Sequence, residues 1–344
     1  MKRAVLNLMR NTGLFAPFRM ANRSKALIVV YHRFSENGNR LATSATAFRE
    51  QIEYLTTHYR VMPLSEMAAY FRRGRRLPPS VAAITIDDGY RDSFEIAFPI
   101  LRQYKVSASV FVATDFIDQR AWLWTDKLRY LTSQADTAML ETTINDRELR
   151  IKLDDSESRL FAASVVNSEL KQIPDEVKDD IITRIASSLN VSLPCVPPGD
   201  FSPLSWEQVR EMDSAGIEVG SHTLTHPILT NISRARLRKE LNESRRRLEE
   251  VLRRKVDLFC YPNGDYDAMV SSEVERAGYT CAVTSRHGLN KRSADPLALR
   301  RIHTERDLVH FVQSTSGFEL LKNRLRRTHP TLIAATACEY FPEF

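Results

Sequence analysis

Cysteine is scarce in this 344-residue sequence, with one residue each at positions 195, 260, 281 and 338. The cysteines form no C-x-x-C pair, so the sequence predicts no disulfide framework and favours a reducing compartment. Zinc-finger spacing, RNP-like aromatic segments and basic-aromatic arrays are also missing, which argues against nucleic acid as a partner. The formal charge of +6 instead suits an anionic partner, such as a phosphorylated substrate or a membrane surface.

Long apolar runs are missing as well. No stretch approaches the ~20 apolar residues of a membrane span, and residues 1–25 are interrupted too often by arginine and lysine to form a signal peptide. The apolar residues between these charges predict either a basic amphipathic segment on an anionic membrane or a helix packed on its own domain, and we favour packing. We therefore expect a cytoplasmic protein, with peripheral contact at the inner membrane face as the further option.

Short β-branched runs alternate with helical periodicity along most of the chain. Apolar runs at 26–32, 82–86, 107–113, 256–261, 279–284 and 297–303, with a shorter one at 216–220, predict about seven strands. Helices between them predict parallel βαβ units with right-handed crossovers. The expected fold is α/β, a distorted (β/α)7-type barrel with a mainly helical insertion.

The pattern changes between residues 119 and 203, where polar helical stretches at 128–140 and 176–189 end in a proline-rich segment. We interpret this part as the insertion, either a lid that shapes the substrate site or a decorative subdomain. The expected divisions of the chain are an N-terminal segment, a first part of the barrel, the insertion, a second part of the barrel and a C-terminal extension, at 1–25, 26–118, 119–203, 204–306 and 307–344.

The strongest single motif is the strand that ends in Asp87, Asp88 and Gly89. Two adjacent carboxylates at a buried strand end repel each other and lose solvation unless a cation or a proton compensates. Gly89 permits a turn that would offer both carboxylates at the mouth of the strand. Taken alone, the motif is equally well explained as an ordinary Asp-Gly turn.

A second motif follows the strand at 216–220. His222 and His226 are spaced i,i+4, which on one helical turn would place both imidazoles on one face. Together with Asp88 from the other strand end they would form a site with two histidines and one carboxylate. Such a set leaves coordination positions open for water and substrate, as catalytic metal sites do.

With these motifs the sequence resembles the polysaccharide deacetylases, the NodB-homology group of carbohydrate esterase family 4. Thr85-Ile86-Asp87-Asp88-Gly89 resembles the family's T-F-D-D-G motif, and Ser221 to His226 resembles its histidine motif. The resemblance implies that Asp87 is the catalytic base. It also implies that Asp88, His222 and His226 bind a divalent metal, with zinc expected.

The third motif of the family departs from its usual R-P-P-Y-G form. Phe259 to Gly264 matches it, so Tyr261, Pro262 and Asn263 are expected to contact the substrate, and the backbone N–H of Asn263 could form an oxyanion hole. Cys260 stands where the family has an arginine that orients the base, and Arg301 is a conjectural replacement. For the catalytic acid, the resemblance leaves two candidates, His303 on the last strand and His32 at the end of the first.

The resemblance implies a metal-dependent hydrolase that removes an N-acetyl or other N-acyl group from an amino sugar. The expected substrate is a polysaccharide or a lipid- or nucleotide-linked glycan precursor, and the predicted cytoplasmic location favours the precursor. Two alternatives stay open. The same site would serve a non-sugar amide, and the altered third motif leaves room for a catalytically silent glycan-binding protein.

Overall fold

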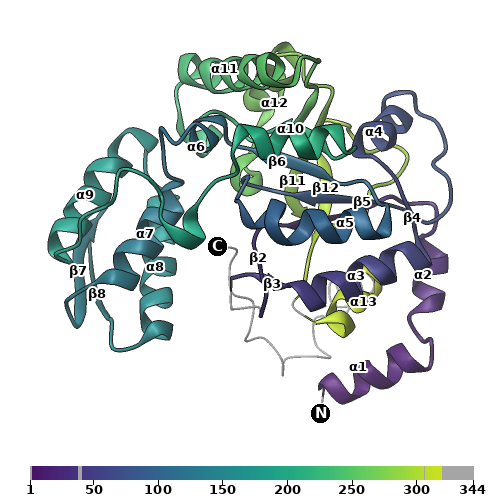
Figure 1. Ribbon diagram of the computed structural model, residues 1–344, viewed down its shortest axis with the longest axis horizontal. Helices are drawn as coiled ribbons and strands as arrows, with labels where there is room; N and C mark the ends of the chain where they lie inside the picture. Colours follow the sequence, from purple (N-terminus) through teal and green to yellow (C-terminus); the bar gives the residue numbers. More distant parts are fainter. Residues whose placement is uncertain (1, 38–40, 306, 320–344) are drawn as a thin grey trace.

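The computed structural model describes residues 2–37, 41–305 and 307–319. Seven parallel strands form a closed barrel (Figure 1), because β1 pairs with the last strand, β12, and also with β5. The predicted α/β barrel of the (β/α)7 type is confirmed. In order around the barrel the strands are β1 (Leu27–Tyr31), β5 (Val81–Ile86), β6 (Ser109–Val112), β9 (Glu218–Ser221), β10 (Leu258–Cys260), β11 (Cys281–His287) and β12 (Leu299–His303).

The apolar runs of the sequence are explained by the position of these strands. Every residue of β1 and of β5 is buried. A strand with side chains of the barrel interior on one face and helices on the other must be apolar on both faces. Outside the ring, β4 (Arg60–Val61) pairs with β5, and β2 (Phe34–Ser35) pairs with β3 (Thr43–Ser44).

Helices cover the outside of the barrel (Figure 1). Side-chain caps start several of them: Ser44, Ser233 and Asp267 each accept a hydrogen bond from a backbone N–H of the first turn. The covering helices are α3 (Ala45–His58), α4 (Leu64–Arg72), α5 (Phe98–Tyr104), α10 (Trp206–Ser214), α11 (Arg234–Leu252), α12 (Ala268–Arg276) and α13 (Leu308–Ser316). Short turns are the π-helical η1 (Ser93–Ala97) and the 3-10 turns η2 (Asp175–Val177), η3 (Gly199–Phe201), η4 (Leu229–Asn231) and η5 (Pro262–Gly264).

The insertion after β6 and the short helix α6 (Thr114–Ile117) forms a separate lobe on the left of Figure 1. It contains α7 (Trp124–Gln134), the antiparallel hairpin of β7 (Met139–Ile144) and β8 (Arg147–Lys152), α8 (Ser156–Leu170) and α9 (Lys178–Ser188). It is mainly helical, as predicted, but the helix expected over 128–140 ends at Gln134, and the hairpin was not predicted. An apolar core of its own includes Leu131, Val166 and Ile185. The exact domain limits stay a prediction.

The N-terminal segment forms α1 (Lys2–Asn11) and α2 (Ala16–Asn22). Phe15 is buried and packs edge-on against Phe318, which favours the packed alternative. Leu8, Leu14 and Met20 nevertheless remain exposed, so membrane contact and cytoplasmic location both stay predictions. Among the described residues, no helix has the length and apolar character needed to cross a membrane.

Candidate active site

Asp87 lies at the end of β5 and is paired with an arginine from the other end of the chain. Arg301 on β12 donates from its two terminal nitrogens to the two carboxylate oxygens of Asp87, at 2.8 and 2.7 Å. Both residues are almost completely buried, with 1% and 2% of their surfaces exposed. The structure thus places Arg301 where it orients the predicted base, in agreement with the conjecture from the sequence.

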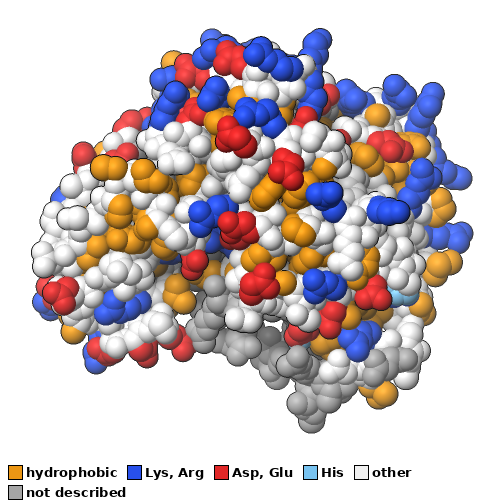
Figure 2. Space-filling view, in the orientation of Figure 1, with side chains coloured by type: hydrophobic (Ala, Val, Ile, Leu, Met, Phe, Trp, Pro, Cys, Tyr) orange, Lys and Arg blue, Asp and Glu red, His pale blue; other side chains and the backbone are white. Residues whose placement is uncertain are grey.

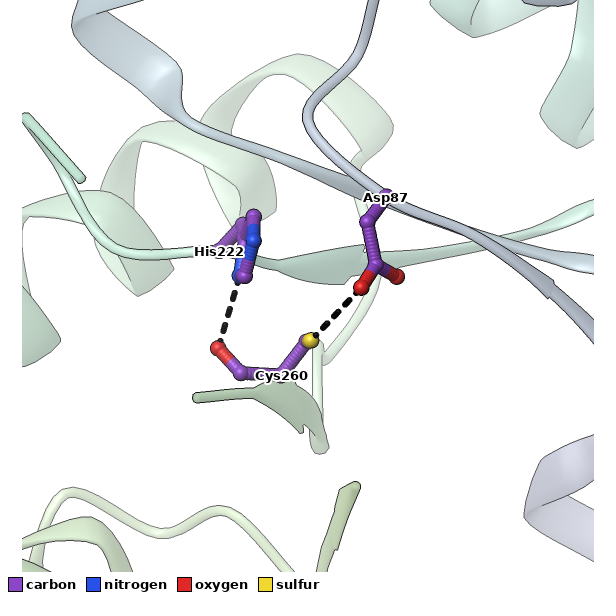
Figure 3. Close-up of side chains that lie close together, drawn as sticks. All are labelled: Asp87, His222 and Cys260. Carbon is purple, nitrogen blue, oxygen red and sulfur yellow. Dashed lines mark hydrogen bonds between the residues drawn. The ribbon is translucent and has the colours of Figure 1, made fainter. Parts of the chain in front are cut away.

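Cys260 makes room for this arginine. Its thiol lies 3.3 Å from Asp87 Oδ2 and 3.3 Å from a terminal nitrogen of Arg301. Figure 3 shows the thiol directed at the Asp87 carboxylate, while the Cys260 carbonyl faces His222. A long side chain at position 260 would occupy the space that the guanidinium fills. The short side chain of Cys260 is therefore a condition for the position of Arg301.

An irregular stretch of β11 accepts the hydrogen bond from Nε of Arg301. The regular pairing of β11 with β12 is interrupted between Val283 and His287, which leaves backbone carbonyls available to side chains. Arg301 Nε donates to the Thr284 carbonyl at 2.8 Å, and His303 Nε2 lies 2.9 Å from the Ser285 carbonyl. The guanidinium is therefore fixed on two sides.

Asp88 reaches the same site as its neighbour because the backbone turns sharply. Side chains of adjacent strand residues normally point to opposite faces, but Asp88 has left the strand and has a φ of 75°. Gly89 follows with a φ of 87°, and a Cβ there would lie 2.9 Å from Val112 Cγ1. Glycine is therefore required at position 89, and the turn predicted from Asp-Asp-Gly is present.

The histidine motif is not helical, and this part of the sequence prediction is wrong. Residues 222–228 form a loop after β9, in which Thr223 and His226 have φ values of 71° and 59°. These two left-handed residues bring the imidazoles of His222 and His226 together, with ring centroids 4.6 Å apart. Such backbone conformations are costly and persist only where the surroundings enforce them.

Glu240 on α11 stabilises this loop conformation through hydrogen bonds, and the sequence analysis did not identify it. Its carboxylate accepts hydrogen bonds from the backbone N–H groups of Leu224 and Thr225 and from the Thr225 hydroxyl, at 3.0, 2.9 and 2.6 Å. The residue is 3% exposed. Charged residues spaced i,i+4 along a helix are typical of a solvated face. Glu240 is such a residue by spacing, and only its burial distinguishes it.

Asp88, His222 and His226 converge with the spacing of metal ligands. Asp88 Oδ1 lies 3.4 Å from His222 Nε2 and 3.5 Å from His226 Nε2, and the two Nε2 atoms are 3.2 Å apart. Ligands held at about 2.0–2.2 Å in a tetrahedral arrangement stand about 3.3–3.6 Å from one another. The predicted donor set therefore fits a zinc-sized ion.

The orientation of His222 supports the same assignment. Its Nδ1 lies 2.8 Å from the Cys260 carbonyl oxygen (Figure 3), and a carbonyl only accepts, so Nδ1 carries the hydrogen. In the neutral ring Nε2 is then the lone-pair nitrogen, directed at Asp88 and His226. Asp87, His222 and Cys260 also lie close enough to form a group of three donors. That group is a poor cation site, because Arg301 already occupies Asp87 and Cys260.

The ionisation of the site depends on its burial and its charges. Burial raises the pKa of Asp87, but the Arg301 guanidinium outweighs burial and lowers that pKa to about 2. Burial also raises the pKa of Asp88, and His222, His32 and His226 more than reverse this effect. Burial, followed by the charge of His222, lowers the pKa of His226 to about 3. Both carboxylates are thus ionised at neutral pH and available to a cation and to a proton.

His222 shows the opposite shift. Burial lowers its pKa, but interactions with Cys260 and Asp88 more than reverse this and raise the pKa well above its ordinary value. The raised pKa of His222 favours an additional proton on its Nε2 when no cation is bound. A proton and a metal ion compete for the same nitrogen, so metal affinity must fall as the pH falls.

The two candidate acids lie on neighbouring strand ends. His303 pairs in register with Val30, two residues before His32. His32 Nε2 lies 3.8 Å from Asp87 Oδ2, and its side chain is 43% exposed, whereas Asp88 is 13% exposed and His222 only 3%. The site therefore opens to solvent on the side of His32 and Asp88, where a substrate can approach.

The third motif was predicted to contact the substrate, and the structure shows where its residues lie. The side chain of Tyr261 is buried, donates to the Leu297 carbonyl at 2.9 Å and stacks on Tyr266. It packs in the core and cannot contact a substrate in this conformation, so the expected role of its side chain is wrong. Pro262 is buried in η5. Asn263 has a φ of 55°, and its Nδ2 is buried without a hydrogen-bond partner among the described residues.

Comparison with known proteins agrees with this geometry. The sequence profile of the polysaccharide deacetylase family matches residues 74–282. YxkH of Bacillus subtilis (strain 168) is 20% identical over 302 residues, which are 88% of this chain and 79% of YxkH. A poly-beta-1,6-N-acetyl-D-glucosamine N-deacetylase of Staphylococcus aureus (strain MSSA476) is 23% identical over 164 residues, 46% of this chain and 56% of that protein.

Solved structures show the same fold. The deacetylase PplD of Streptococcus pyogenes, in complex with acetate, superposes with a TM-score of 0.57 at 17% identity, over 85% of this chain and 98% of PplD. IcaB from Ammonifex degensii gives a TM-score of 0.55 at 19% identity, over 85% of this chain and 97% of IcaB. The family profile covers more than half of the sequence and includes both aspartates and both histidines of the site. The chain therefore belongs to the polysaccharide deacetylase family, and it is a hydrolase of the deacetylase class.

Proposed function

We propose that the protein removes the N-acetyl group from an amino sugar of a glycan and that the reaction needs a divalent cation, with zinc expected. The observation that carries this proposal is the convergence of Asp88, His222 and His226 within 3.5 Å, directly beside the ionised Asp87. Two imidazoles and one carboxylate are the donor set of catalytic rather than structural zinc sites. When bound, the cation would polarise the amide carbonyl and lower the pKa of a water molecule.

The residues of this chain would supply the proton transfers. Asp87 would take a proton from the attacking water, and Arg301 would hold both of its carboxylate oxygens in place. His32 is our candidate for protonating the leaving amine, because it is partly exposed and lies 3.8 Å from Asp87. His303 would take a positioning role, since its Nε2 faces the Ser285 carbonyl.

N-Acetylglucosamine is the first sugar to test. The name of the Staphylococcus aureus relative states that it acts on poly-beta-1,6-N-acetyl-D-glucosamine. We propose the same class of substrate for this chain. A non-sugar amide would need the same chemistry at the metal, so the choice between the two depends on the substrate panel.

The test is acetate release by protein stripped with a chelator and reloaded with zinc, cobalt, manganese or nickel. The panel contains N-acetylglucosamine, its β-1,4- and β-1,6-linked oligomers, and N-acetylated amino acids. We expect activity only on the sugars and only after reloading. Turnover by the stripped protein would refute the metal requirement, and turnover confined to the amino acids would refute the sugar assignment.

A further inference from the structure

The excess positive charge of the chain is concentrated at its N-terminus. The sequence has 49 lysines and arginines against 43 acidic residues, and its first acidic residue is Glu36. Residues 1–25 contain six of the basic residues, so the rest of the chain has as many basic as acidic residues. The net charge of +6 is therefore that of this segment, which would face an anionic partner.

Three basic segments meet at the N-terminal ends of the barrel strands, at 19–25, 72–76 and 291–292. They are joined by three hydrogen bonds, from Ser80 N–H to the Arg23 carbonyl, from Ala26 N–H to the Asn290 carbonyl and from Arg292 Nε to the Gly74 carbonyl. In Figure 2 lysine and arginine side chains gather along the right edge, where α4 and β4 lie in Figure 1. We refer to the three segments together as the basic face.

Much of the charge on the basic face has no acidic neighbour. Arg23 and the four arginines of 72–76 are exposed, and no carboxylate of the described chain lies within ion-pair distance of them. Exposed arginines elsewhere are paired, as in Arg246 with Glu250 on α11 at 2.8 Å. Clustered positive charges without counter-charges repel one another, and an anionic surface would relieve that repulsion.

Exposed apolar side chains accompany this charge. Leu8, Leu14 and Met20 are 63%, 51% and 56% exposed. Phe15 of the same segment is buried against Phe318, so the segment is fixed to the barrel while these three side chains face solvent. A nucleic acid or a soluble anion offers nothing to exposed leucine and methionine. A lipid surface accepts apolar side chains below its headgroups and attracts the basic residues beside them.

We propose that the basic face and the exposed apolar residues of the N-terminal segment dock the protein on an anionic lipid surface. The arginines would lie against lipid phosphates, and Leu14 and Met20 would insert between the headgroups. Asp88 and His222 follow β5 and β9, at the opposite ends of the strands. The barrel mouth that they form therefore stays open to solvent in the docked protein. The proposal is independent of the proposed function.

Sedimentation with lipid vesicles tests the charge. We compare pure phosphatidylcholine with phosphatidylcholine that contains about one third phosphatidylglycerol, and expect binding only to the anionic vesicles, weakened by salt. Arg75→Gln with Arg76→Gln should lower the partition coefficient roughly 10- to 30-fold. Arg184→Gln with Arg246→Gln removes the same charge from exposed positions on α9 and α11 and should change nothing.

Leu14→Ser with Met20→Ser tests the apolar contact. This variant should lose about 10-fold or more in partition to the anionic vesicles, with an unchanged unfolding midpoint because both side chains are exposed. Met139→Ser with Phe161→Ser is the control, since these apolar residues are exposed on the insertion, and it should bind as the parent does.

The results that would overturn the proposal are distinct. They are absence of vesicle binding by the parent, equal binding to neutral vesicles, and equal losses in a test variant and its control. Tighter binding of the parent to a DNA duplex than to the vesicles, unaffected by Leu14→Ser with Met20→Ser, would identify a nucleic acid as the partner instead. A parent dimer that this variant dissociates, with vesicle binding unchanged, would assign the apolar residues to a second copy of the chain.

Discussion

The barrel mouth and the insertion differ in how they arrange buried charge. In the insertion, the buried Asp126 and Lys178 are each paired with an oppositely charged residue, Arg129 and Asp175. At the barrel mouth Asp87 and Arg301 are buried and paired, next to two buried histidines. The core of the insertion is instead an apolar cluster that includes Leu131, Val166 and Ile185. Electrostatic interactions are much stronger away from water, and at the barrel mouth two carboxylates and two histidines converge, which suits proton transfer. We therefore assign the reaction to the barrel mouth.

Loss of a metal ligand should be the most severe change at the barrel mouth. His226→Ala should abolish stoichiometric zinc binding and lower activity by about three powers of ten or more, because a Lewis acid contributes several kcal/mol to catalysis. Elemental analysis and acetate release provide the measurements. His58→Ala, an exposed histidine on α3, is the control. Full metal content in His226→Ala would refute the proposed ligand set.

Asp87→Asn should separate catalysis from metal binding. The neighbour Asp88 holds the cation in our proposal, so Asp88→Asn should lose metal and activity together. Asp87→Asn should keep the metal and lose roughly 10²–10⁴-fold in kcat, the usual contribution of a general base. A metal-free Asp87→Asn protein would mean that the roles of the two carboxylates are reversed.

Arg301→Met should weaken the barrel mouth in both stability and catalysis. Removing one partner of a buried ion pair typically costs about 3–5 kcal/mol, which urea denaturation would measure. Arg301 is the group that lowers the pKa of Asp87 to about 2. Without it burial dominates and the pKa rises, so the base is lost at a higher pH as the solution is acidified.

The acid limb of the kcat profile of Arg301→Met should accordingly move to higher pH. Arg300→Met, its exposed neighbour, should change neither stability nor profile. An unchanged acid limb in Arg301→Met would show that Asp87 does not determine this limb.

Tyr90→Phe, at the junction of the barrel with the insertion, should have the smallest effect. The change removes the hydrogen bond from the Tyr90 hydroxyl to Asp126, while Asp126 keeps its pairing with Arg129. Hydrogen bonds to charged groups contribute about 1.5–3 kcal/mol. We expect a loss of about that size in unfolding free energy, with metal content retained. Tyr130→Phe in the insertion is the control, and equal losses in both variants would argue against a special role of the junction.

The sequence was most informative where local chemistry and burial coincide. Strands β1 and β5 are buried on both faces, so their apolar runs are continuous and easily detected. The hairpin of β7 and β8 was missed because one face is solvated and charged residues dominate β8. The helix predicted over 128–140 overlaps only Met139 and Leu140 of the first strand.

The site could be predicted by residue type but not by backbone. An i,i+4 spacing predicts a helical turn, and it carries no trace of the left-handed conformations of Thr223 and His226. Glu240 lies 3.9 Å from Arg236, as on any charged helix face, and its burial depends on the histidine loop above it. Arg301 could be suspected only because Cys260 stands in the place of an arginine. The position of Arg301 beside Asp87 depends on the pairing of β1 with β12, which closes the barrel.

The closure between β1 and β12 also determines when the site can form. Asp87 and Arg301 are 214 residues apart in the chain, and the last strand is the one that completes both the barrel and the ion pair. Contacts of such long range form slowly, and chains are synthesised from the N-terminus at about 5–20 residues per second. A nascent chain therefore carries an unpaired Asp87 for on the order of 10–40 s. Activity consequently reports that synthesis has passed β12.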